Sequence, residues 1–173
     1  EEGQHGHVER PFDRLYLPAA SDRADESRDE PVARDRSQRG SPASIAAVGF
    51  GLSAIHTGVD RGWISRTAAR DRVLATLRTF WEAPQGTGVS GTIGYRGFFY
   101  HFLDLATATR MASWDTELSS IDTGLLLAGI LDARQYFDRT DPAEAWIREL
   151  ADSIYARVEW DWMRNGGASL SHG

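Results

Sequence analysis

Residues 119–137 read SSIDTGLLLAGILDARQYF and predict a helix that is apolar around more than half of its circumference. Gly124 and Gly129 supply small side chains that allow neighbouring helices to approach closely. Asp122 or Ser119 stands where the first turn needs an N-cap, because a short polar side chain satisfies free N–H groups there. The apolar positions are Leu125, Leu126, Leu127, Ile130, Leu131, Tyr136 and Phe137. A helix of this composition is buried between other helices.

The flanking segments predict three more helices. Asp141-Pro142 starts an amphipathic one, because proline is tolerated in a first helical turn. Its inward positions are Trp146, Leu150, Ile154 and Val158, and its outward positions are Glu144, Arg148, Glu149 and Asp152. Earlier in the chain, Ser41-Pro42 starts a helix that ends at Gly62, and Ser65 caps a second one that ends before Pro84. Their apolar stripes are Ile45, Val48, Leu52, Ile55 and Val59, then Ala69, Val73, Leu77, Phe80 and Trp81.

Residues 84–113 follow a different pattern. Glycines between Gly86 and Gly97 indicate a loop, and FFYHFL at residues 98–103 is rich in aromatic side chains that favour strands. We expect an irregular loop or a small β-hairpin here. Two helical hairpins, the second pairing a buried helix with an amphipathic one, indicate the inner and outer layers of an all-α toroid. A chain with about four or five helices is too short to close such a ring, so residues 41–173 are predicted to form about half of a toroid.

Composition excludes several classes of function. The chain has 173 residues, a net charge of −6 and no cysteine. The acidic balance argues against a nucleic-acid or anionic-membrane partner, which requires a basic patch. The lack of cysteine excludes disulfides, thiolate nucleophiles and cysteine-based metal sites. No apolar run approaches the ~20 residues that span a bilayer, and the polar start, Glu1 to Arg10, does not resemble a signal peptide.

Residues 1–40 form a separate segment by composition. Between Ser21 and Gly40 acidic side chains alternate with arginines, and apolar side chains are nearly absent. Such a segment gains too little from burial to offset its ordering entropy, so we expect a charged, mobile linker. Before it, Phe12, Leu15 and Tyr16 have helical spacing and predict a short docking helix.

Six short segments stand in one order along residues 43–173. They are ASIAAVGF (43–50), RGWI (61–64), GFFYHFLD (97–104), ELSSIDT (117–123), YF (136–137) and SHG (171–173). Together they resemble the bacterial glucoamylase-like family of (α/α)6-barrel proteins, which includes endo-β-1,2-glucanases. Each motif alone is weak, but six in register are specific. The resemblance implies a glycoside hydrolase that acts on a β-linked glucan, with β-1,2-glucan favoured.

The resemblance also implies features outside this sequence. In the family, Ser-His-Gly is followed by tryptophan, further acidic residues and the remaining barrel helices. At least one catalytic carboxylate is therefore expected beyond Gly173. Members of the family are commonly exported, so the resemblance implies a secreted or periplasmic location.

The candidate catalytic residues are Glu117, Asp122 and Asp104. Glycoside hydrolysis needs two carboxyl groups that flank the scissile bond. Glu117 and Asp122 stand at the start of the buried helix, where the inner helices of a toroid face the central cleft, and Asp104 ends the aromatic loop. Simpler roles stay open for all three: Asp122 as a helix cap, Glu117 as a solvated side chain and Asp104 as the first residue of an Asx turn.

The candidate sugar-binding residues are Tyr95, Phe98, Tyr100, His101 and His172. Aromatic faces stack on the apolar faces of pyranose rings, and the polar ends of Tyr and His form hydrogen bonds with hydroxyl groups. The alternative is that these aromatic side chains pack the loop itself.

No metal ion or other cofactor is expected. The histidines lack metal-ligand spacing, no Gly-x-Ser-x-Gly elbow occurs, and the glycine-rich loop lacks the residues of a phosphate loop. The expected partner is an oligo- or polysaccharide. The alternative to a hydrolase is a non-catalytic carbohydrate-binding or assembly protein built from the same half-barrel. An incomplete toroid exposes an apolar face, which a second copy of the chain or a missing C-terminal half would cover.

Overall fold

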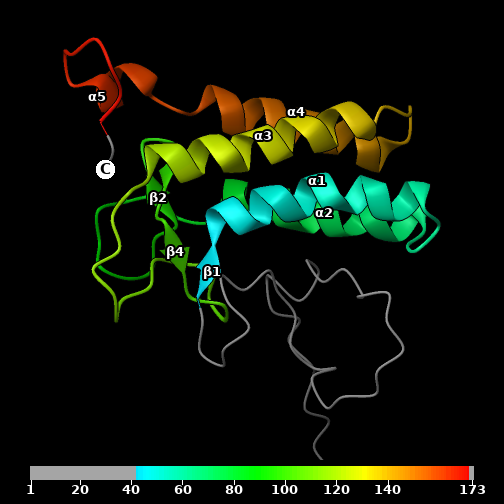
Figure 1. Ribbon diagram of the computed structural model, residues 1–173, viewed down its shortest axis with the longest axis horizontal. Helices are drawn as coiled ribbons and strands as arrows, with labels where there is room; N and C mark the ends of the chain where they lie inside the picture. Colours follow the sequence, from blue (N-terminus) through cyan, green and yellow to red (C-terminus); the bar gives the residue numbers. More distant parts are fainter. Residues whose placement is uncertain (1–41, 172–173) are drawn as a thin grey trace, which may run out of the picture.

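The computed structural model describes residues 42–171 of the chain (Figure 1). In this range lie the helices α1 (Ile45–Asp60), α2 (Arg66–Glu82), α3 (Ser120–Tyr136), α4 (Pro142–Ala156) and α5 (Trp160–Arg164), and the strands β1 (Ala43–Ser44), β2 (Gly94–Tyr95), β3 (Phe98–Phe99) and β4 (Phe102–Leu103). The prediction of a helical fold with a small β-hairpin is confirmed. The segment 1–40, with its predicted docking helix, lies outside the described residues, as does His172.

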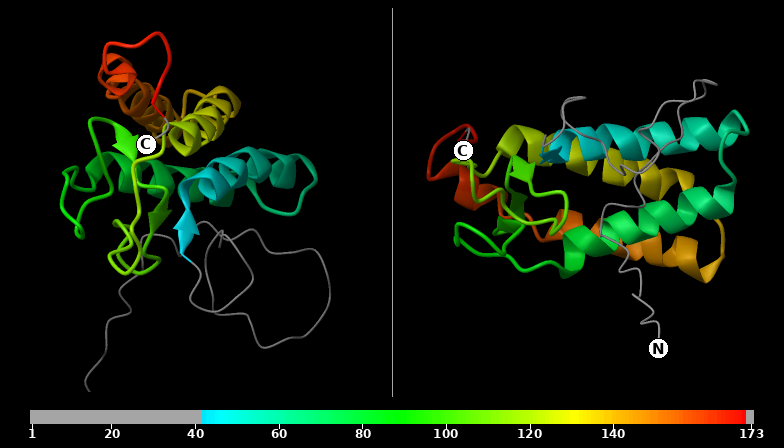
Figure 2. Two further views of the ribbon diagram at one scale, coloured as in Figure 1. Left: turned by 60° about the vertical axis from the view of Figure 1, so that its left-hand side comes forward. Right: turned by 90° about the horizontal axis from the view of Figure 1, so that it is seen from below.

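The four long helices form two layers. Helix α1 packs against α3, and α2 packs against α4. The two views in Figure 2 show that α1 and α3 begin at the same end of the molecule, whereas α2 and α4 run in the opposite direction. The strands and α5 gather at the end where α1 and α3 begin. This is the inner and outer layering of an α/α toroid, of which the chain forms a part.

Serine and aspartate caps set the helix starts. Oγ of Ser65 accepts a hydrogen bond from Ala68 N at 3.2 Å, and Oδ1 of Asp141 accepts one from Ala143 N at 3.0 Å, as the sequence predicted. Ser44, rather than Ser41-Pro42, caps α1, because Ala43 and Ser44 are held in an extended strand. Ser119, rather than Asp122, caps α3.

Two short antiparallel pairs organise the aromatic segment. Strands β2 and β3 form a hairpin whose turn residues Arg96 and Gly97 have φ values of 52° and 81°. A two-residue turn with both φ values positive matches the right-handed twist of a hairpin. Strand β1 pairs with β4, which joins the start of α1 to the aromatic segment.

Helices α1 and α3 touch through their backbones at two glycines. A Cβ atom on Gly129 would overlap the backbone of Gly49, and one on Gly49 would overlap the backbone at Leu125 and Leu126. The core of large buried side chains surrounds this crossing and includes Phe80, Phe98, Phe99, Phe137, Ile45, Leu52, Ile55, Leu77, Ile93, Leu103 and Leu126. The small residues that the sequence placed in α3 therefore permit direct helix contact.

The predicted orientation of α4 was wrong at its first turn. Glu144, expected to face outward, is buried with 3% of its surface exposed, whereas Trp146, expected to face inward, is 40% exposed beneath the guanidinium of Arg78. Arg66 of α2 donates to both Glu144 carboxylate oxygens, at 2.8 and 2.9 Å. Hydrophobic periodicity did not predict the burial of Glu144, because an ion pair across the helix interface compensates a carboxylate that would otherwise be costly to bury.

Helix α3 is less enclosed than predicted. Ile121 is 56% exposed, and Leu125 and Leu131 are each 37% exposed. Within residues 42–171 the helix packs on α1 and α4, and these two neighbours leave part of its circumference uncovered. Trp81 of α2, also predicted to face inward, is 39% exposed under the guanidinium of Arg157.

The glycine contact predicts a stability difference. Gly129→Ala should lower the free energy of unfolding by about 1–3 kcal/mol, because the helices must separate to admit a methyl group. Gly124→Ala on the same helix is the matched control, since its Cβ meets nothing within 4 Å. The control should gain about 0.5–1 kcal/mol from the better helix former. Urea denaturation measures both, and equal changes would contradict a direct backbone contact.

The buried ion pair gives a second prediction. Glu144→Gln should lower the free energy of unfolding by about 3 kcal/mol at neutral pH, because Arg66 loses its buried charge partner and keeps Asp138, a largely exposed carboxylate 3.3 Å away. Glu82→Gln is the control, since Glu82 pairs with Arg78 on the surface, where both side chains are about half exposed. Its loss should stay within about 1 kcal/mol.

The same pair sets a pH dependence. The hydrogen bonds from Arg66 lower the pKa of Glu144. The stabilisation is therefore complete above the ordinary pKa of glutamate and is lost as pH falls through the lowered pKa of the folded state. The stability difference between the wild-type chain and Glu144→Gln should shrink over this acidic range. A difference that stays constant there would contradict the assignment.

Candidate active site

Backbone hydrogen bonds tie the aromatic segment to the starts of both inner helices. His101 N donates to Glu117 O at 3.0 Å, and Ser119 N donates to Phe99 O at 3.1 Å. On the other side of the segment, Ile45 N at the start of α1 donates to His101 O at 3.3 Å. These bonds bring parts of the chain that are far apart in sequence to one end of the inner layer.

His101 lies between two of the predicted catalytic carboxylates. Its Nε2 is 2.9 Å from Oδ2 of Asp122, and its Nδ1 is 3.8 Å from Oε1 of Glu117. The imidazole also stacks on Phe102, with ring centroids 4.0 Å apart and 15° between the planes. The structure thus brings together Glu117, Asp122 and His101, which we call the His101 cluster.

The two carboxylates of the cluster differ in exposure. The Glu117 side chain is 52% exposed and the Asp122 side chain 13%. Asp122 lies in the first turn of α3, where the helix dipole favours a negative charge. Among the described residues no donor reaches its Oδ2 with hydrogen-bond geometry, although Nε2 of His101 is close. Glu117 is therefore the carboxylate that a substrate can reach, and Asp122 lies behind the imidazole.

Asp104 has a different role. Its Oδ1 accepts hydrogen bonds from Ala106 N and Thr107 N, both at 2.9 Å, and from the Thr107 hydroxyl at 3.0 Å. These bonds define an Asx turn. Of the two alternatives that the sequence left open for Asp104, the structure shows the turn, and it does not place this carboxylate in the His101 cluster.

The predicted sugar-binding aromatics mostly belong to the core. Phe98 is fully buried and packs edge-on against Trp160, with centroids 5.3 Å apart. Tyr100 is 4% exposed, and its hydroxyl donates to Gly86 O at 2.9 Å. Both side chains pack the interior, which is the alternative that the sequence left open for them, and neither is exposed to a sugar in this structure. Tyr95 is half-buried, with its ring edge-on to Trp162.

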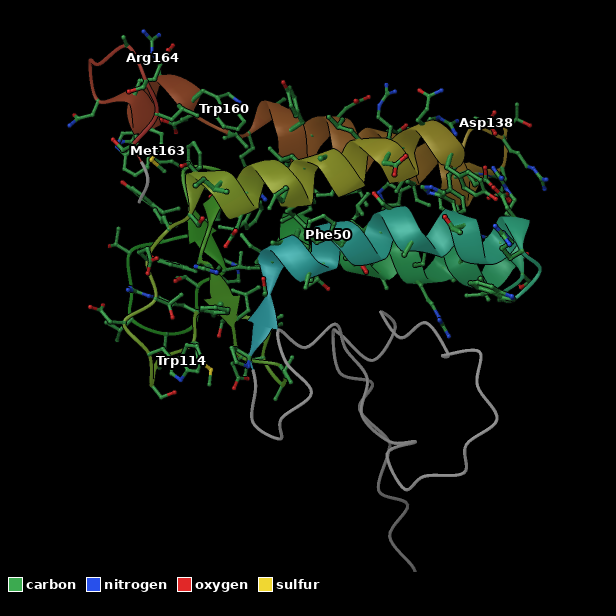
Figure 3. All side chains as sticks on the ribbon, in the orientation of Figure 1. Phe50, Trp114, Asp138, Trp160, Met163 and Arg164 are labelled. Carbon is green, nitrogen blue, oxygen red and sulfur yellow. The ribbon has the colours of Figure 1, made fainter. Side chains whose placement is uncertain are left out.

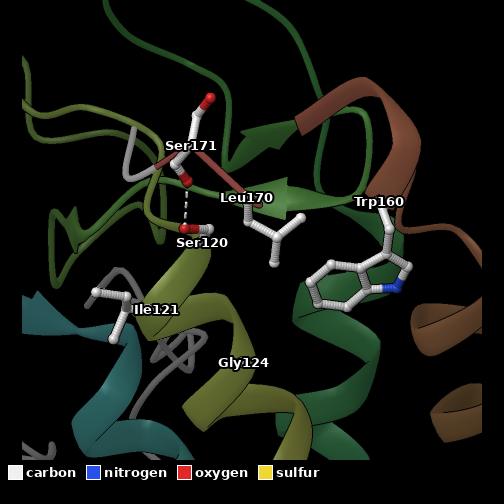
Figure 4. Close-up of a pocket in the computed structure, with 6 residues that line it drawn as sticks. All are labelled: Ser120, Ile121, Gly124, Trp160, Leu170 and Ser171. Atoms are coloured by element: carbon white, nitrogen blue, oxygen red, sulfur yellow. Dashed lines mark hydrogen bonds between the residues drawn. The ribbon is translucent and has the colours of Figure 1, made fainter. Parts of the chain in front are cut away.

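A hollow of about 370 Å³ opens beside the first turn of α3 (Figure 4). It is lined by Ser120, Ile121, Gly124, Trp160, Leu170 and Ser171. Ser120 Oγ donates to Ser171 O at 2.7 Å, which holds the segment before His172 against α3. No functional role was predicted for Trp160 or Leu170. Their position after a helix and beside a glycine-rich turn was the only available signal.

A second hollow, of about 300 Å³, is lined by Val89, Arg110, Ala112, Ser113, Trp114 and Asp115. Figure 3 shows Trp114 in the loops on the far side of the strands from Trp160. Trp114 is 46% exposed and meets Phe102 edge-on, with centroids 5.1 Å apart. Because Phe102 stacks on His101, this hollow is one ring away from the His101 cluster.

Residues 42–171 lack two other features. No group of three or more metal-ligating side chains converges within this range. None of its helices combines the length and apolar composition required to cross a bilayer.

Comparison with known proteins places these features in a family context. No family model matches the chain. Its sequence is 31% identical over 124 residues to the exo β-1,2-glucooligosaccharide sophorohydrolase (non-reducing end) of Parabacteroides distasonis, a match that covers 70% of this chain and 16% of that protein.

Two solved structures share the fold. A candidate glucoamylase from Bacteroides uniformis aligns with a TM-score of 0.70 at 21% identity, over 93% of this chain and 38% of that one. The endo-β-1,2-glucanase of Chitinophaga pinensis aligns with a TM-score of 0.64 at 25% identity, over 75% of this chain and 29% of that one. The chain therefore spans well under half the length of these relatives. Its sequence and fold resemble those of the glucoamylase-like (α/α)6-barrel proteins, which include endo-β-1,2-glucanases.

Proposed function

We propose that the chain serves in the hydrolysis of a β-linked glucan, with β-1,2-glucan as the favoured substrate. The relatives named for β-1,2-linked substrates support this class. The observation that carries the proposal is the exposed carboxylate of Glu117 just before the inner helix α3, since a hollow lined in part by Trp160 opens beside the first turn of the same helix. Acid–base chemistry on a glycosidic bond requires a carboxyl group in this kind of setting.

Glu117 is the proposed acid–base residue. It is the more exposed carboxylate of the His101 cluster, and the cluster lies where the inner helices begin. Glycoside hydrolysis uses a second carboxyl group on the other side of the scissile bond. In our proposal this second group comes from the part of the ring that residues 42–171 do not form.

Two hollows next to the cluster are proposed to hold glucosyl units. The hollow at α3 offers the indole of Trp160 together with Ser120, and the second offers Trp114 flanked by Arg110 and Asp115. Indole faces stack on the apolar faces of pyranose rings. Charged and hydroxyl side chains at the edge of such a hollow form hydrogen bonds with sugar hydroxyls.

The test is hydrolysis of a panel of linear β-glucans, β-1,2-glucan included, by the protein with a complete ring, and the readout is the release of reducing ends. Glu117→Gln should lower the rate about 10²–10⁴-fold, because the amide neither donates nor accepts the catalytic proton. It should retain oligosaccharide affinity within about threefold, since a β-1,2-linked trisaccharide keeps its contacts with the hollows. Glu149→Gln, on the exposed face of α4, is the matched control and should leave both quantities unchanged.

Two outcomes would contradict the hydrolase. Equal rates for the wild-type chain and Glu117→Gln would remove Glu117 from the chemistry. Trisaccharide binding by the wild-type protein with a complete ring, without hydrolysis of any glucan, would favour the non-catalytic alternative. The exposed apolar side chains Phe50, Ile121 and Leu125 support a form of that alternative in which a second copy completes the ring, and sedimentation equilibrium would detect the dimer.

A further inference from the structure

We propose that His101 is a positioning residue that links the buried carboxylate of Asp122 to the exposed carboxyl group of Glu117. In this arrangement Asp122 fixes the imidazole, and the imidazole fixes Glu117. The inference rests on the proposed function for the role of Glu117 in hydrolysis. The arrangement of the three side chains is a property of the chain itself and can be tested without substrate.

The first step concerns Nε2 of His101, which faces the carboxylate of Asp122. Its Oδ2 is buried, 2.9 Å from Nε2 of His101, and receives no aligned hydrogen bond from the described residues. A buried carboxylate oxygen gains strongly from a donor at that distance. Nε2 of His101 is close enough to donate after a small rotation of the ring, so Asp122 favours the tautomer that carries its proton on Nε2.

The second step is that the ring has little freedom to turn away. Phe102 stacks on one face of the imidazole, with centroids 4.0 Å apart. The backbone is held on both sides, by His101 N donating to Glu117 O at 3.0 Å and by Ile45 N donating to His101 O at 3.3 Å. His101 and Glu117 are therefore coupled through their backbones as well as through their side chains.

The third step concerns the other nitrogen. With the proton on Nε2, Nδ1 carries a lone pair and faces Oε1 of Glu117 at 3.8 Å. It can accept a hydrogen bond from the Glu117 carboxyl group when that group holds the proton to be donated to the glycosidic oxygen. Catalytic hydrogen bonds are often long without substrate and shorten in the complex. Nδ1 thus holds the Glu117 carboxyl group in place before reaction, the carboxyl proton turns from Nδ1 to the glycosidic oxygen when it is donated, and no covalent bond to His101 forms or breaks.

The substrate-free test locates the ring proton by long-range ¹H–¹⁵N NMR of the 173-residue chain at neutral pH. His101 should carry its proton on Nε2, and Asp122→Asn should shift the population toward Nδ1–H. His56 is the internal control: it lies on α1 with its own Asp132 at 3.8 Å, and Asp122→Asn should leave its signals unchanged. A wild-type His101 with its proton on Nδ1, or one that ignores Asp122→Asn, would overturn the proposal.

The catalytic test uses His101→Gln, whose amide can still donate to Asp122 but offers nothing to Glu117. Its kcat should fall about 10²-fold with KM within about threefold, because a misdirected proton donor costs rate rather than binding. His101→Asn places its amide oxygen close to the position of the wild-type Nδ1 and should therefore recover part of that loss. The control variant His56→Gln should have the kcat of the wild type. An unchanged kcat in His101→Gln would refute the positioning role. If the wild-type protein with a complete ring hydrolyses no glucan, the proposed function fails, and the NMR result alone decides the arrangement.

Discussion

The direct backbone contact between α1 and α3 is the constraint on which the rest of the structure depends. At Gly49 and Gly129 there is no space for even a methyl group, so the two inner helices lie closer than side chains would permit. Since both helices run in the same direction, their N-terminal ends meet on one side of the molecule. Every candidate functional residue that the structure brings together lies at that end.

The aromatic strand segment connects the N-terminal ends of the two inner helices and positions His101 between them. Its peptide groups bond to the start of α1 on one side and to the turn before α3 on the other. Phe98, Phe99 and Tyr100 fill the space between the helices, which leaves His101 as the first side chain of the segment to emerge near the surface. Burial of three successive aromatic residues thus fixes where the imidazole lies relative to the α3 carboxylates.

Sequence reasoning identified the members of the His101 cluster but not its internal order. Glu117 and Asp122 were found from their place before and within the first turn of an apolar helix, and His101 from its place in the aromatic run. The same reasoning also selected Phe98 and Tyr100, which are buried. Strand residues alternate between faces, and no local pattern tells whether both faces will be covered. That depends on α5 and its preceding loop, more than fifty residues further along the chain.

By itself the sequence determined the helices, their caps at Ser65 and Asp141, the aromatic hairpin and the family resemblance, because these follow from local periodicity, short-range hydrogen bonding and ordered motifs. Only the tertiary structure decided which faces are buried. Glu144 was assigned to solvent from its charge, yet Arg66, far away in sequence, makes its burial favourable. Likewise, only the packed structure places an imidazole between two carboxylates. Pairwise electrostatics depends on distance in space, and the order of residues along a chain does not specify that distance.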